Sequence, residues 1–244
     1  MAANRPRACR VPPAALGFLL PPPKAVSVTR ATVFVDGANL YRGLKSIGVR
    51  ATRLDIRRFS WKLVRGRELR DVRYYIARVD RSGGRAYEAN RALIAALEAT
   101  SGVTLRLGYI QRTEEKNPCA EELARYLANL RSLRIPGRVF RDLAAMAREH
   151  RRVTVFREKG VDVALAVDLV RLAHADAFDV AYLVSGDGDF APAVESVRVL
   201  RKKVFAAGPA IGKRLHDAAD LSIRLAKDWF EDCLSSSGTS SGGT

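Results

Sequence analysis

Four aspartates lie next to predicted strands or helices, and together they have the chemistry of a metal site. They are Asp36, Asp162, Asp187 and Asp189. Carboxylates that share one cleft repel one another and raise each other's pKa unless a cation neutralises them. Oxygen ligands suit Mg²⁺ or Mn²⁺, and two such ions can activate water and stabilise the leaving oxygen of a phosphodiester. The pattern predicts metal-dependent hydrolysis without a covalent intermediate.

Two of these aspartates are placed by the predicted strands that precede them. Asp36 follows the apolar run 32–35, and Asp187 comes shortly after the run 180–184. In an open parallel sheet, ligands bind beyond the carboxyl ends of the strands, near the point where the strand order reverses. Both carboxylates should therefore project over one edge. Asp189 lies two residues further on, and the flanking glycines let the backbone turn so that both acids approach one point.

Each position also has a purely structural interpretation. Asp187 and Asp189 fit a surface Gly-Asp turn, and Asp36 fits the cap of a helix that begins near Asn39. Asp162 lies in the first turn of a predicted helix, where amide dipoles stabilise a carboxylate whether or not it binds metal. We favour metal binding for all four, with Asn39 as their polar neighbour.

Asp168 lies on the apolar stripe of the helix that Asp162 opens. Its carboxylate either anchors Lys159, an arginine or a backbone amide, or binds metal directly, and the sequence leaves these alternatives open. His150, His174 and His216 have no metal-ligand spacing, so we assign them no catalytic role.

Strand-like and helical patterns alternate along most of the chain. We expect strands at 31–35, 72–77, 103–110, 153–156, 180–184 and 203–207, and helices at 39–47, 55–64, 87–99, 121–133, 139–149, 161–174, 191–200 and 215–230. The alternation predicts a mainly parallel sheet with helices packed on its faces. Segment 114–150 interrupts it and is predicted to be a helical insertion.

The composition favours a polyanionic partner. The chain has 244 residues, 42 of them Lys or Arg against 26 Asp or Glu, and a net charge of +16. That balance indicates RNA, DNA or an anionic surface. Three distant cysteines suggest neither a disulfide framework nor a zinc site, so a cytoplasmic setting is the default. No apolar run is long enough to cross a bilayer, and we expect no membrane partner.

The two ends differ from the rest of the chain. Residues 1–29 contain a proline-interrupted apolar run and are predicted to be a disordered leader rather than an export signal. The tail 235–244 is rich in Ser and Gly and cannot bury enough surface to fold. One domain is therefore expected at 30–234. The sequence leaves the choice between monomer and homodimer open.

Three motifs resemble the NYN-domain family of PIN-like nucleases, in particular its LabA-like branch. They are Val33-Phe-Val-Asp36-Gly-Ala-Asn39-Leu40, Lys159-Gly160-Val-Asp162-Val-Ala-Leu-Ala-Val-Asp168 and Ser185-Gly-Asp187-Gly-Asp189-Phe190. They occur in the family's order and span residues 32 to about 225.

The resemblance implies a Rossmann-like three-layer α/β/α fold, divalent metal ions and endoribonuclease activity, with the four aspartates at the acidic positions and Asn39 beside them. Asp220 matches a position where the family often has an acid, so Asp168 and Asp220 are additional candidate ligands. The insertion at 114–150 departs from the shorter family pattern and puts the substrate preference in doubt.

Two other functions compete with a ribonuclease. A catalytically inactive RNA- or DNA-binding module of the same fold would be favoured by loss of an acid, yet every principal position is occupied. A nucleotidyl-transfer or topoisomerase-primase site would use Asp187-Gly-Asp189, but it would need a glutamate after an early strand, where this chain has Asp36.

Overall fold

The computed structural model describes residues 28–80, 84–129 and 136–235. Most of the predicted leader and nearly all of the predicted tail lie outside these ranges. The described part is built around one seven-stranded sheet in the order β4-β3-β2-β1-β5-β6-β7. The strands are β1 (Arg30–Asp36), β2 (Glu68–Arg78), β3 (Val103–Lys116), β4 (Arg152–Lys159), β5 (Val180–Val184), β6 (Lys203–Gly208) and β7 (Leu221–Arg224). All neighbours are parallel except β3 and β4.

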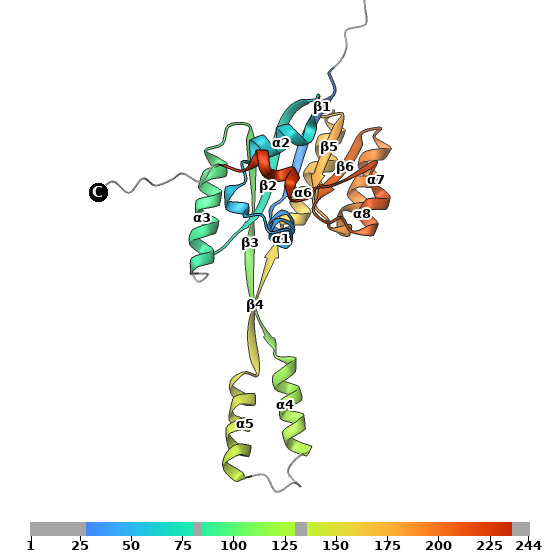
Figure 1. The fold of residues 1–244 in the computed structure, drawn as a ribbon. Helices are drawn as coiled ribbons and strands as arrows, with labels where there is room; N and C mark the ends of the chain where they lie inside the picture. Colours follow the sequence, from blue (N-terminus) through green and yellow to red (C-terminus); the bar gives the residue numbers. More distant parts are fainter. Residues whose placement is uncertain (1–27, 81–83, 130–135, 236–244) are drawn as a thin grey trace, which may run out of the picture.

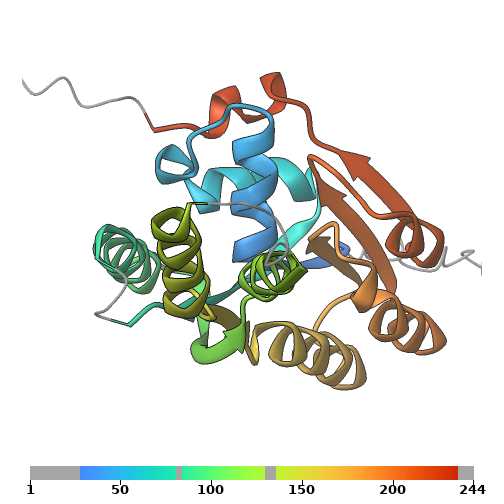
Figure 2. The same ribbon diagram turned by 90° about the horizontal axis from the view of Figure 1, so that it is seen from below.

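Helices cover both faces of the sheet and give the three-layer α/β/α fold that the sequence predicts (Figures 1 and 2). The α-helices are α1 (Gly37–Ser46), α2 (Ile56–Val64), α3 (Arg85–Glu98), α4 (Pro118–Asn129), α5 (Gly137–Glu149), α6 (Val161–His174), α7 (Ala191–Val199) and α8 (Lys213–Ala218), and the 3-10 helices are η1 (Ala51–Arg53), η4 (Gly188–Phe190) and η5 (Asp228–Cys233).

The central strand β1 contributes to two apolar cores. Its alternate residues Val33 and Val35 pack with α1 and α2 on one face, whereas Phe34 packs with α6 and α7 on the other. Because successive side chains of a strand point to opposite faces, a strand that is apolar throughout fits only between two helical layers. This arrangement explains why residues 31–35 form one continuous apolar run.

The two helices of segment 114–150 are carried by two strands that are longer than predicted. Strand β3 continues to Lys116 and pairs with β4 antiparallel, from Tyr109 opposite Lys159 to Lys116 opposite Arg152. Helices α4 and α5 lie at the far end of this ribbon and project away from the body (Figure 1). They contact each other and bury Leu127 and Ala147.

The predicted C-terminal helix at 215–230 is wrong. The helix α8 ends at Ala218, after which residues 221–224 form β7 and residues 228–233 form η5. Asp220 donates its backbone N–H to the carbonyl of Val204 at 2.9 Å, and β7 then pairs with the open edge of β6. These ladder hydrogen bonds come from tertiary structure, which overrides the local helical pattern.

No helix in the described ranges combines the length and apolar character needed to cross a membrane.

Candidate active site at the carboxyl edge of the sheet

The carboxyl ends of β1 and β5 lie side by side where the strand order reverses. Val35 pairs with Val184, so the next residues, Asp36 and Ser185, sit at the same level. The Ser185 hydroxyl donates to Asp36 Oδ2 at 3.0 Å, and the Asn39 N–H donates to Asp36 Oδ1 at 3.0 Å. Asp36 is therefore the N-cap of α1. Each carboxylate oxygen keeps a second lone pair for another ligand, so capping does not prevent metal binding.

Hydrogen bonds join Asp36 and the start of α1 to the loop after β5. Ser185 Oγ accepts from the N–H of Asp187 at 3.1 Å. Asn39 Oδ1 accepts from the N–H of Gly186 at 2.9 Å, and Asp187 Oδ1 accepts from the N–H of Asp189 at 2.9 Å. The loop is thus held against the start of α1 by side chains from both elements.

Gly186 allows this loop to pass close to another segment. A Cβ atom at this position would lie 2.3 Å from the carbonyl oxygen of Ala210 and 3.5 Å from Asn39 Oδ1. Only glycine fits without moving the backbone. Asp187 is half-buried and Asp189 exposed in the resulting turn.

Asp162 and Glu158 approach the same edge from the start of α6 and the end of β4. Gly160, which precedes α6, has a φ of 82°, a left-handed conformation that favours glycine. It turns the chain so that Asp162 lies in the first turn of the helix. Glu158 Oε1 accepts from the backbone N–H of Ala77 at 2.8 Å. These two acids come from elements that follow segment 114–150.

Burial and mutual repulsion raise the pKa of three of these acids. Burial is the main cause at Asp36, Glu158 and Asp162. The Asp162 charge adds to the rise in the pKa of Asp36, and both acids add to that of Glu158, whereas the pKa of Asp162 is raised further by Asp187 and Asp189. Arg42 opposes these effects. The five carboxylates therefore form one electrostatic cluster, which we call the acid cluster.

The acid cluster suits a hard cation in its chemistry, because its donors are all oxygens and they repel one another. Among the described residues, however, no three Asp, Glu, His or Cys side chains lie close enough together to hold one ion. The carboxylates would have to move toward a shared cation. Asp189 is exposed in its turn, so solvent reaches its carboxylate.

Asp168 lies apart from the acid cluster and has four partners of its own. It accepts hydrogen bonds from Arg73 at 3.0 Å, from the Tyr75 hydroxyl at 3.0 Å, from Arg106 at 3.3 Å and from Arg171 at 3.1 Å. These donors lower the pKa of Asp168 against the opposing effect of burial. The contacts fit the anchoring interpretation, in which Asp168 fastens α6 to β2 and β3.

Asp220 is also placed away from the acid cluster. Its Oδ2 accepts from the N–H of Val204 at 2.8 Å, and its Oδ1 lies 3.2 Å from Arg198. Val204 is near the amino end of β6, whereas the acid cluster lies at the carboxyl ends. These contacts stabilise the connection into β7.

Ser185 and Glu158 are not among the site residues that the sequence predicts. Ser185 directly follows a buried strand and precedes Gly-Asp, so its position at the sheet edge was a usable signal. Glu158 directly precedes the Lys159-Gly160 motif, but its contact with Ala77 depends on the pairing of β4 with β3. No local pattern predicts that contact.

Comparison with known proteins gives two likenesses. A solved structure of a protein of unknown function from Vibrio parahaemolyticus RIMD 2210633 has 19% sequence identity and a TM-score of 0.47, with 84% of this chain and 98% of the other covered. No curated protein matches the chain. The family model for the NYN domain matches residues 116–226, a region that contains Asp162, Asp187 and Asp189 and excludes β1.

Proposed function

We propose that this protein is a metal-dependent endoribonuclease that hydrolyses phosphodiester bonds. The observation that carries the proposal is the acid cluster, where carboxylates come from β1, β4, α6 and the loop after β5 to one edge of the sheet. Burial first, and then repulsion between the carboxylates, raises the pKa of three members. Perturbed carboxylates in one place are typical of functional sites. The match to the NYN domain supports a PIN-like nuclease. From the resemblance of the three sequence motifs together, we propose that it belongs to the LabA-like branch.

We assign the binding of Mg²⁺ or Mn²⁺ to Asp36, Asp162, Asp187 and Asp189. A bound ion of this kind supplies an activated water and neutralises charge on the phosphate. Ser185 and Asn39 position Asp36, and Asn39 also fixes Gly186 and with it the loop that bears Asp187.

Exposed arginines near the acid cluster support a nucleic-acid substrate. Arg42 on α1 is close enough to lower the pKa of Asp36 and Asp162. Neither Arg42 nor Arg78, at the end of β2, makes an ion pair with any residue that the structure describes. Together with the net charge of +16, these free guanidinium groups suit the phosphates of RNA.

One observation favours the alternative of a binding module without catalysis. Within the described ranges the acids do not form a ready-made metal site. A module that only binds nucleic acid would need the basic surface but not the carboxylates. The two functions therefore separate on whether the acids are required.

The decisive experiment incubates labelled single-stranded and duplex RNA and DNA with the wild type and with Asp187→Asn. We expect the wild type to cleave single-stranded RNA with Mg²⁺ or Mn²⁺, and neither the variant nor the EDTA-treated protein to do so. Asparagine also caps well, so η4 should survive the change. Full activity in excess EDTA would contradict the mechanism, and RNA binding without cleavage would establish the binding module.

A further inference from the structure

The ribbon formed by β3 and β4 leaves the body at the acid cluster. Its eight residue pairs, from Tyr109–Lys159 to Lys116–Arg152, extend roughly 26 Å at the usual rise per residue. Figure 1 shows the ribbon projecting from the side of the body where β1 runs into α1. Glu158, a member of the acid cluster, is part of this ribbon. A strand of substrate that reached the acid cluster would therefore meet the ribbon next.

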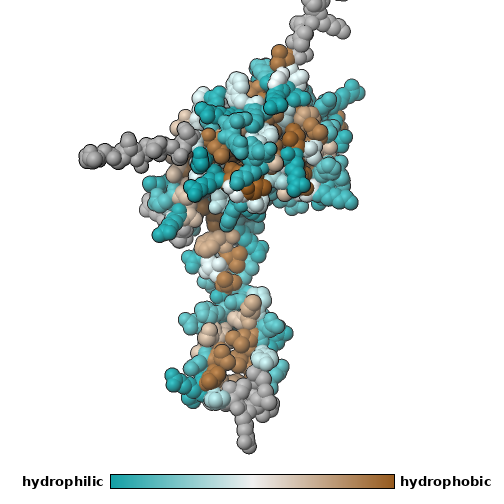
Figure 3. Space-filling view, viewed as in Figure 1, coloured by the Kyte–Doolittle hydropathy of each residue, from teal (hydrophilic) through white to brown (hydrophobic). Residues whose placement is uncertain are grey.

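The two faces of the ribbon differ in what they expose. Side chains alternate along each strand, and directly paired residues share a face. Glu158 therefore shares its face with Phe156 and with Arg112, which pairs with Phe156. Phe156 is 53% exposed, and Figure 3 shows apolar side chains at the surface of this ribbon. Arg112 forms no ion pair in the described part of the chain.

The opposite face offers a matched contrast. It carries Tyr109, which is 62% exposed, and Arg157. The guanidinium of Arg157 lies 2.8 Å from the carboxylate of Glu115, so its charge is already paired. This face also carries Lys159, which pairs with Tyr109 and forms no ion pair in the described part of the chain. The Glu158 face differs because its free cation is an arginine and because its exposed ring shares the face with a member of the acid cluster.

We propose that Arg112 and Phe156 bind a nucleotide of single-stranded RNA next to the site of cleavage, an inference that rests on the proposed function. A base stacks on the exposed Phe156 ring, which suits every base because each has a π-face. Arg112 contacts the adjoining phosphate. Phe156 lies two residues from Glu158, about 7 Å along the strand, so the bound nucleotide is a near neighbour of the scissile phosphate. The bases of a duplex are stacked on one another and cannot use the ring.

The test measures binding of a fluorescein-labelled oligouridylate of about 12 nucleotides, within the ~4–16 nucleotides typical of single-strand sites. Fluorescence anisotropy in EDTA keeps binding separate from cleavage. We compare the wild type with Phe156→Ala and Arg112→Ala, and use Tyr109→Ala and Arg157→Ala as matched variants of the opposite face. Circular dichroism verifies that each variant is folded.

We expect Phe156→Ala to weaken binding about tenfold, the lower part of the range for loss of one base–aromatic stack. Arg112→Ala should reduce the slope of log K against log salt by about 0.7, the value for one phosphate contact of a single strand. A folding defect would not produce this change in slope. The opposite-face variants should bind within about twofold of the wild type, a change smaller than the loss of one stack.

Equal losses on both faces, no loss at Phe156, or no binding by the wild type would overturn the inference. So would the same loss with duplex RNA. Cleavage by the wild type with unchanged binding in the Phe156 variant would refute this surface but leave the nuclease standing. Binding that depends on Phe156, in the absence of any cleavage, would support this surface but refute the nuclease.

Discussion

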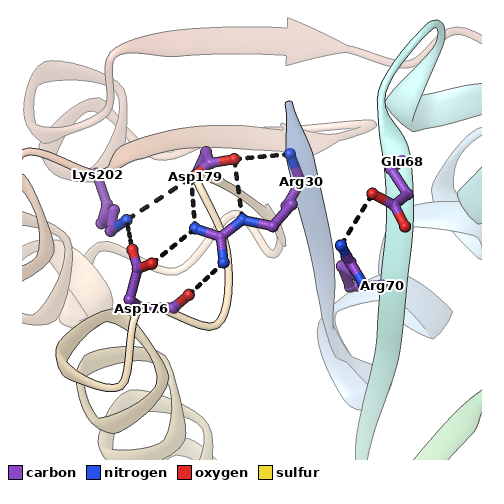
Figure 4. A network of polar contacts seen from close by, with 6 residues as sticks. All are labelled: Arg30, Glu68, Arg70, Asp176, Asp179 and Lys202. Carbon is purple, nitrogen blue, oxygen red and sulfur yellow. Dashed lines mark hydrogen bonds and ion pairs between the residues drawn. The ribbon is translucent and has the colours of Figure 1, made fainter. Parts of the chain in front are cut away.

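The two ends of the central sheet both carry aspartates, but their electrostatic surroundings are opposite. At the amino ends of the strands, Arg30 of β1 donates to Asp179 at 2.8 Å and to Asp176 at 3.0 Å (Figure 4). Lys202, before β6, pairs with both aspartates. Hydrogen bonds from these cations lower the pKa of Asp176 and bring that of Asp179 to about 2.

At the carboxyl ends the acids have hydrogen-bond donors but few cations. Asp36 is bound by a serine hydroxyl and a backbone amide, and its pKa is raised by burial and by Asp162. Among the described residues, the acid cluster forms one ion pair, in which Arg214 lies 3.9 Å from the carboxylate of Asp189. Both groups of acids lie beside strands of the same sheet, and ion pairing distinguishes them. The acids at the amino ends are paired and stabilise the fold, whereas the acid cluster remains available for a ligand.

The largest expected effect comes from Asp36→Asn. We expect cleavage to fall more than about 100-fold, because loss of a residue that merely supports a ligand already costs 10- to 100-fold. The melting temperature should stay equal or rise, since an amide carries no charge to desolvate. Rate assays and thermal unfolding of the same preparation measure both. Lower stability with unchanged cleavage would place Asp36 among the structural acids.

Ser185→Ala tests the support of Asp36 without removing a carboxylate. The variant loses the donor to Asp36 Oδ2 and the acceptor for the Asp187 N–H, so we expect cleavage about 10- to 100-fold slower. Ser185→Thr keeps the hydroxyl and should recover most of the activity. A higher metal requirement for Ser185→Ala would distinguish positioning from a general packing defect. Wild-type kinetics in Ser185→Ala would refute the role.

Asp168→Ala should have a large effect on stability. The substitution leaves Arg73, which is mostly buried, with Asp71 as its one remaining carboxylate partner among the described residues. Removing one partner of a buried ion pair lowers the free energy of unfolding by about 3–5 kcal/mol. Because Arg106 and Arg171 are more exposed than Arg73, we expect a loss of about 2–3 kcal/mol here. Denaturant unfolding measures the change. Full stability combined with loss of metal binding would instead make Asp168 a ligand.

Asp179→Asn should have a smaller effect that depends on pH. The folded-state pKa of Asp179 is about 2 against an ordinary 3.8, so its ion pair stabilises the fold above about pH 4 and loses this effect as the pH falls toward 2. The difference in unfolding free energy between wild type and variant should shrink over that window. Denaturant titrations from pH 7 to about 2 test this, and a pH-independent difference would contradict it. Cleavage at neutral pH should be unchanged.

The positions of Asp36 and Asp187 were predictable because continuous apolar runs fix buried strands, and parallel strands end at a common edge. The three-layer architecture follows from the same alternation of strands and helices. The partners of Asp168 were not predictable, since Arg73 and Arg106 come from strands 95 and 62 residues away in sequence.

The missed elements share one physical cause. The extension of β3 to Lys116 and the strand β7 both depend on hydrogen bonds to another strand. Short polar or mixed segments adopt a β conformation when a neighbouring edge offers such bonds, and their own sequence contains little information about that edge. The contact between Glu158 and Ala77 was missed for the same reason.

Binding of Mn²⁺ tests the contrast between the two ends of the sheet most directly. We would titrate the wild type, Asp36→Asn and Asp179→Asn with Mn²⁺ and follow the free ion by electron paramagnetic resonance. The acid cluster should bind Mn²⁺ in the wild type and in Asp179→Asn, and at least about tenfold more weakly in Asp36→Asn. Equal binding by all three proteins, or no binding by the wild type, would contradict the assignment of a metal site to the carboxyl edge.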